Sequence, residues 1–145
     1  MTCTFFGNRN TPSDIQPKLE EILEEYIKNN KADKFYVGNH GSFDSMVLTT
    51  LRKLKKIYPH IDYTVVLAYM PTEKDNIYDY SETLYPEGLE TVPQRFAIDR
   101  RNRWMLEKSD MVIAYARNDY SCSAKYMKLA RNKKKEIINI FEIKN

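Results

Sequence analysis

The chain is poor in the residues that mark several classes of protein. It has two cysteines, Cys3 and Cys122, and two histidines among 145 residues, too few for a disulfide framework or for a cluster with zinc-ligand spacing. No apolar run reaches the roughly 18–20 residues of a membrane span, and the first residues lack the basic-then-apolar layout of a signal peptide. We therefore expect a cytoplasmic protein that has no membrane contact and holds neither a metal nor a cofactor.

The composition that remains is that of an ordinary globular domain. Apolar residues make up 42% of the chain and charged residues 30%, which excludes a disordered or low-complexity chain. A length of 145 residues suits one domain around one core. Charge is uneven, because residues 1–99 carry a net charge of −4 and residues 100–145 carry +7. A basic C-terminal third is compatible with an anionic ligand, with a nucleic acid, or simply with solvated helix faces.

Short β-prone segments alternate with segments of helical period along the whole chain. Five strands alternating with helices predict parallel pairing, hence an α/β fold: a Rossmann-like three-layer sandwich with a parallel sheet of about five strands. We expect a single domain over residues 1–145, with a long loop at 72–93 that is either a lid over a ligand or a surface insertion. The predicted strands are 3–6, 34–37, 62–69, 110–115 and 136–141, and the predicted helices are 15–28, 43–57, 94–108 and 121–132.

The turns after the strands are the places where chemistry is expected. Ligands of an open parallel sheet bind beyond the carboxyl ends of the strands, where turns lead into helices whose unpaired N–H groups attract anions. Three of the four glycines lie in the first two of these turns, although a tight turn also needs glycine for structure alone. The residues predicted to bind a phosphate or other ligand there are Gly7, Asn8 and Arg9; Gly38, Asn39, His40, Gly41, Ser42 and Asp44; and Ser121, Cys122 and Ser123.

The predicted helix 94–108 contributes a basic segment to the same edge of the sheet. At helical spacing at least one of its arginines points toward the ligand, while an exposed basic helix remains the alternative. We select Arg101 and Asn102 as ligand-binding residues. We expect Arg101 to lie at the solvent edge, where an arginine contributes little to folding.

Three motifs occur in the order that is typical of one superfamily. Phe6-Gly7-Asn8-Arg9 is similar to an F-T/S-G-H-R start, residues 35–44 are similar to F-x-x-G-x-x-G-x-F-D, and residues 101–105 are similar to R-N-x-x-M ahead of an S-D-x-V-I strand. Together they resemble the SLOG superfamily, which groups the DprA/Smf proteins with the Lonely Guy phosphoribohydrolases, and most closely its YpsA-like branch. The resemblance covers nearly the whole chain and implies a pocket for a nucleotide or a nucleotide-derived ligand.

The resemblance to the Lonely Guy enzymes is incomplete. Those enzymes cleave the N-glycosidic bond of nucleoside monophosphates with an arginine, which Arg101 matches, and with a glutamate in a glycine-rich loop. In this chain Ser121-Cys122-Ser123 stands where relatives carry G-G-A/T, and no glutamate follows until Glu136. Asn8 also replaces the usual histidine. The carboxylate that the reaction needs is therefore missing from its expected place.

These observations favour binding over catalysis. The leading hypothesis is a sensor, carrier or sequestering protein that binds a phosphorylated nucleotide or an ADP-ribose-like signalling ligand, and the resemblance also implies self-association into a dimer or larger homo-oligomer. The alternative is a nucleoside-phosphate N-glycosidase in which Arg101 is catalytic and the carboxylate is relocated to Asp44, Glu82, Glu87 or Glu90. A second alternative, less favoured, is DprA-like binding of single-stranded nucleic acid through Lys133-Lys134-Lys135 and the nearby Tyr126.

Overall fold

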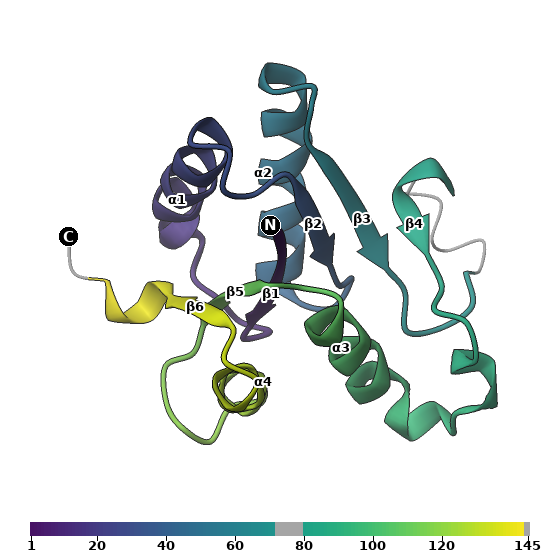
Figure 1. Ribbon diagram of the computed structural model, residues 1–145. Coiled ribbons are helices and arrows are strands. Elements are labelled where there is room, and N and C mark those ends of the chain that lie inside the picture. Colours follow the sequence, from purple (N-terminus) through teal and green to yellow (C-terminus); the bar gives the residue numbers. More distant parts are fainter. Residues whose placement is uncertain (72–79, 144–145) are drawn as a thin grey trace.

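A six-stranded parallel sheet forms the middle layer of the structure, a computed structural model that describes residues 1–71 and 80–143 (Figure 1). All neighbouring strands in the sheet are parallel. The expected α/β, Rossmann-like architecture is confirmed, with one strand more than the five predicted. In spatial order the strands are β4 (Thr83–Leu84), β3 (Asp62–Val66), β2 (Lys34–Val37), β1 (Thr2–Gly7), β5 (Met111–Tyr115) and β6 (Glu136–Asn139).

Helices cover both faces of the sheet and complete the sandwich. The helices α1 (Gln16–Lys28) and α2 (Ser42–Ile57) pack on one face, and α3 (Ala97–Glu107) and α4 (Cys122–Asn132) pack on the other (Figure 1). Successive strand residues point to opposite faces, so Phe5 enters the core beneath α1 and α2 while Phe6 enters the core beneath α3 and α4. This alternation divides the apolar residues of β1 between two cores.

The segment 72–93 contains a strand that the sequence did not predict. Its described part, residues 80–93, holds the short 3-10 helices Tyr80–Glu82 and Leu89–Thr91 with β4 between them. β4 pairs with β3 through Val65 and Thr83 and through Val66 and Leu84. Two residues are too few to produce a period-2 pattern, so β4 left no signal in the sequence. If the segment were a lid, Tyr78 and Tyr85 would be candidates to stack on a base. Tyr85 is partly buried and packs against the core beneath α1 and α2, and Tyr78 lies outside the described residues.

Several predicted elements end earlier than expected. β3 stops at Val66, and the N–H of Leu67 then donates to the carbonyl of Leu84 at 2.8 Å. β6 stops at Asn139, whose side chain accepts the N–H of Phe141 and begins a 3-10 helix. In the part of the chain that the structure describes, no helix is long and apolar enough to span a bilayer. The carboxyl ends of β1, β2 and β5 all meet at one edge of the sheet, because these strands are parallel neighbours.

Candidate functional site

A cleft of about 470 Å³ lies at this edge, where the turns after β1, β2 and β5 come together with α3. Its volume is within the range of roughly 300–1,000 Å³ that is usual for small-molecule sites. The predicted residues that line it are Gly7, Asn8, Arg9, His40, Asp44, Arg101, Asn102, Cys122 and Ser123. Three turns and one helix, far apart in the sequence, are thus brought to one concave surface.

The other predicted residues lie beside the cleft. Gly38 and Asn39 line a smaller cavity of about 180 Å³, which shares Asp44 with the cleft. Gly41, Ser42 and Ser121 line neither cavity. Their observed contacts hold the turns in place, and direct contact of these three with a ligand stays a prediction.

Ser42 and Gly41 fasten the first turn to the second. The N–H of Ser42 donates to the carbonyl of Arg9 at 2.9 Å, and its hydroxyl donates to the same carbonyl at 2.7 Å while accepting the N–H of Thr11 at 2.8 Å. Gly41 has a φ of +92°, and a Cβ there would lie 2.9 Å from the Cα of Arg9. Only glycine suits this close approach and this backbone conformation. These contacts use the backbone of Arg9 and leave its side chain exposed at the cleft.

Arg101 is buried and bonded to other segments, and is not the solvent-edge residue that we expected. Its residue exposure is 2%, although its side chain forms part of the cleft wall. Nη1 donates to the Asn39 side-chain oxygen at 3.0 Å and to the carbonyl of Val66 at 2.9 Å, and Nε donates to the Asn102 side-chain oxygen at 2.7 Å. Nη2 lies 3.2 Å from Nδ1 of His40. One guanidinium therefore joins α3 to the end of β3 and to the turn after β2.

Asp44 places a carboxyl group beside this guanidinium. It lies in the first turn of α2, and its Oδ2 accepts the N–H of His40 at 3.0 Å. Burial raises its pKa from the ordinary value to about 6, against the opposing effects of the Arg101 charge and the His40 N–H. Of the four carboxylates proposed as replacements for the missing glutamate, Asp44 is the one that lines the cleft. Glu82 instead pairs with Arg52 at 2.6 Å and accepts the hydroxyl of Tyr63.

The floor of the cleft is aromatic. The rings of Phe6 and Tyr126 stack with centroids 4.8 Å apart, and both line the cleft. The Tyr126 hydroxyl donates to Asp99 at 2.6 Å, and burial together with this carboxylate raises the pKa of Tyr126 to about 12. Burial alone would raise the pKa of Asp99, but hydrogen bonds from Lys125, Tyr126 and Arg103 outweigh it and hold the pKa at about 2. Tyr126 is thus fixed as a neutral ring under the ligand space.

The start of α4 forms the remaining wall. The Ser121 hydroxyl caps the helix by accepting the N–H of Ala124 at 3.2 Å. The Ser123 hydroxyl lies 3.0 Å from the Asn8 side-chain oxygen and ties this helix to the turn after β1. The Cys122 thiol is exposed at the cleft. Cys122 and Ser123, in the first turn of α4, therefore line the same space as Arg9.

Sequence reasoning missed the apolar lining of the cleft, which is formed by Phe5, Phe6, Ile98, Met105 and Tyr126. A signal for Phe5 and Phe6 was available, because they end the predicted strand 3–6 directly before the glycine turn at Gly7. Met105 and Tyr126 carried the helical period of core residues, and the sequence alone does not separate a core residue from one at the edge of a cleft. Among residues 1–71 and 80–143, no three His, Cys, Asp or Glu side chains are grouped so that they could hold a metal ion.

Comparisons with known proteins identify the fold. No family model matches the chain, and no curated protein matches its sequence. DNA processing protein A from Helicobacter pylori, described as binding single-stranded DNA, superimposes with a TM-score of 0.68 and 16% identity, over 94% of this chain and 63% of that one. DNA processing protein A (DprA) from Streptococcus pneumoniae superimposes with a TM-score of 0.67 and 14% identity, over 94% of this chain and 48% of that one. This chain thus spans less than two thirds of either.

At these identities the likeness concerns the fold. The neighbours are DprA proteins, one of the two groups in the superfamily that the sequence motifs resemble. The Rossmann-like fold that the resemblance implies is therefore supported, while membership of the SLOG superfamily and of its YpsA-like branch stays a prediction.

Proposed function

We propose that this chain binds a phosphorylated nucleotide or an ADP-ribose-like ligand in the cleft. The observation that carries the proposal is an exposed arginine that lines the same cleft as the start of α4, above an aromatic floor. Arg9 supplies a forked donor for a phosphate, and Cys122 and Ser123 in the first turn of α4 line the same space. Phe6 and Tyr126 supply a flat apolar surface that suits a base. In line with the resemblance of its motifs to the YpsA-like branch of the SLOG superfamily, the proposed role is that of a sensor, carrier or sequestering protein.

Binding is tested with purified protein and a panel of nucleoside monophosphates and ADP-ribose, followed by calorimetry. Arg9→Ala is expected to weaken binding by about 1–3 kcal/mol, the scale of a lost hydrogen bond to a charged group. Arg95→Ala is the matched control, because Arg95 is exposed and lies outside the cleft. Equal affinity of both variants for every ligand would contradict the assignment of Arg9. Native mass spectrometry of protein purified from cells would identify a retained nucleotide by its mass.

Hydrolysis of an N-glycosidic bond is a second candidate, and Asp44 favours it. A carboxyl group whose pKa lies at about 6 is suited to general acid–base work near neutral pH. Asp44 would replace the missing glutamate, and Arg101 would hold it and the turn around it in position. Release of free base from nucleoside monophosphates, followed by chromatography and abolished in Asp44→Asn, would establish the activity. No base release under saturating substrate would leave binding as the function.

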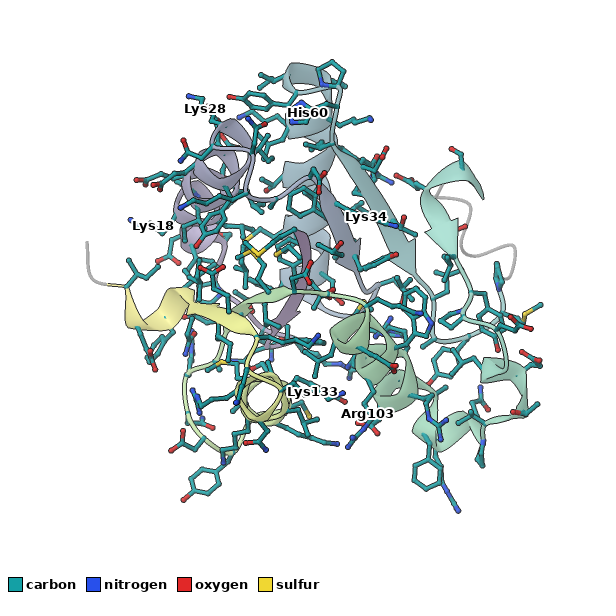
Figure 2. All side chains as sticks on the ribbon, viewed as in Figure 1. Lys18, Lys28, Lys34, His60, Arg103 and Lys133 are labelled. Carbon is teal, nitrogen blue, oxygen red and sulfur yellow. The ribbon has the colours of Figure 1, made fainter. Side chains whose placement is uncertain are left out.

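Nucleic-acid binding is a third candidate because the Helicobacter pylori neighbour is described as binding single-stranded DNA. The residues proposed for it differ in their exposure. Lys133 and Lys134 are exposed, whereas Tyr126 is buried beneath the cleft and Lys135 donates to the carbonyl of Ser109. Lys133 at the end of α4 and Arg103 on α3 do lie on the same side of the sheet (Figure 2). Salt-dependent retention of an oligonucleotide would support this candidate, and absence of binding at low salt would exclude it.

The remaining expectation is self-association, which follows from the superfamily resemblance. A dimer or larger homo-oligomer would be detected by sedimentation at several protein concentrations. A constant monomer mass over the whole range would contradict it.

A further inference from the structure

The carboxyl group of Asp44 stands between two cavities. It lines both the cleft of about 470 Å³ and the smaller cavity of about 180 Å³. A Cβ placed on Gly38 would lie 2.8 Å from the Asp44 Oδ2 and 3.0 Å from the Arg101 Cζ. The carboxyl group and the guanidinium therefore converge on a glycine that leaves room for both.

Among the residues that the structure describes, the positive charge that acts on Asp44 is that of Arg101 on α3. His40, in the turn before α2, contributes its backbone N–H, and Arg9 lines the same cleft from the turn after β1. Arg52 lines the smaller cavity and is paired with Glu82. Burial raises the pKa of Asp44 to about 6 because it outweighs the nearby positive charge of Arg101 and the hydrogen bond from His40.

We propose that Asp44 is the charge gate of the cleft: in its neutral form it permits an anion to bind beside Arg9, and in its ionised form it weakens the binding of that anion. This inference rests on the proposed binding function and adds the group that regulates it. Binding of the anion in turn favours the neutral carboxyl group, so binding and proton uptake are coupled.

The size of the cleft makes this coupling strong enough to measure. A sphere of the same volume would be roughly 10 Å across, about one Debye length at 0.1 M ionic strength. An anion anywhere in the cleft is therefore within reach of the Asp44 charge. A partly buried position also screens this charge less than an exposed one.

The smaller cavity adds polar space next to the carboxyl group. Ser45 and Thr49 line this cavity together with Asp44. The carboxyl group therefore borders a second cavity as well as the cleft in which the anion would bind.

Sulfate is the probe, because its own charge stays constant between pH 5.0 and 7.5. A change of its affinity with pH therefore comes from the protein and not from the ligand. Binding is followed by amide chemical shifts at constant ionic strength for the wild-type protein, Asp44→Asn and His40→Gln. Wild-type affinity is expected to fall roughly tenfold to thirtyfold from pH 5.0 to 7.5, because a carboxyl group with a pKa of about 6 is mostly neutral at pH 5.0 and almost fully ionised about 1.5 units above that pKa. Asp44→Asn is expected to bind equally at both pH values, and His40→Gln is expected to keep the wild-type dependence.

Each outcome decides the proposal. Equal wild-type affinity at both pH values, a pH dependence that persists in Asp44→Asn, or one that disappears in His40→Gln would overturn the gate. Absence of sulfate binding in all three proteins would instead contradict the proposed binding function. If Asp44→Asn does not fold, carbon NMR of the wild-type carboxyl group replaces it: a titration midpoint that rises on addition of sulfate supports the gate, and an unchanged midpoint overturns it.

Discussion

Replacement of Arg101 by alanine is expected to destabilise the whole domain. The guanidinium is buried and joins α3 to the end of β3 and to the turn after β2 through hydrogen bonds of 2.9 Å and 3.0 Å. Alanine removes the donor to the Val66 carbonyl and the donor to the Asn39 side chain. It also removes the positive charge that opposes the burial of the Asp44 carboxyl group. The variant therefore loses contacts between three elements at once.

The magnitude follows from the chemistry of these contacts. One hydrogen bond to a charged group contributes about 1.5–3 kcal/mol, and removing one partner of a buried charged arrangement costs about 3–5 kcal/mol. Because the contacts share one side chain, they do not add, and we expect a loss of about 3–5 kcal/mol. For a domain of this size, each kcal/mol lowers the Tm by about 2–4 °C. The expected shift is thus roughly 10 °C.

Urea unfolding and thermal scans of Arg101→Ala and Arg103→Ala measure the effect. Arg103 lies on the same helix and pairs with Asp99, but its side chain is 47% exposed, so its loss is expected to cost less than about 1 kcal/mol. Arg101→Lys keeps the charge without the planar fork and is expected to fall between wild type and alanine. A Tm for Arg101→Ala equal to that of Arg103→Ala would refute the connecting role.

Three further predictions concern backbone strain and pH. Gly41→Ala is expected to lose about 1 kcal/mol more stability than Gly88→Ala, because both glycines have a positive φ but only Gly41 lies against another backbone segment, that of Arg9. Equal losses of the two variants in urea unfolding would contradict the close approach of Gly41 to Arg9. The lowered pKa of Asp99 means that its contribution to stability is present above about pH 4 and is lost as the pH falls toward 2. Because the side chain is 36% exposed, we expect this contribution to be no more than about 1 kcal/mol. An unchanged dependence of stability on acid pH in Asp99→Asn would exclude it. The raised pKa of Asp44 has the opposite sign, so stability is expected to fall as the pH rises from about 4 to 6, and the same slope in Asp44→Asn would assign the loss to another group.

The sequence predicted the fold better than it predicted the state of individual side chains. Alternating strand and helix periods are local signals, and they located every strand except β4, whose two residues are ordered by pairing with β3. Glycine turns at strand ends located the cleft in the same way. The burial of Arg101 depends on three partners from distant segments, and no local pattern encodes it. The burial of Tyr126 was likewise not predicted, because a charge run and a nearby aromatic residue do not reveal which way a helix faces.

The position of β1 between β2 and β5 also determines when the sheet can close during synthesis. Cys3 of β1 pairs with Met111 of β5, so one edge of β1 stays unpaired while roughly a hundred further residues are made, for about 5–20 s at ordinary elongation rates. An open strand edge is a template for pairing with another chain. Nascent chains that end before residue 110 are therefore expected to aggregate or to recruit chaperones, and release from chaperones is expected once β5 has emerged. The strand at the centre of the finished sheet is thus the most exposed to misassembly while the chain is incomplete.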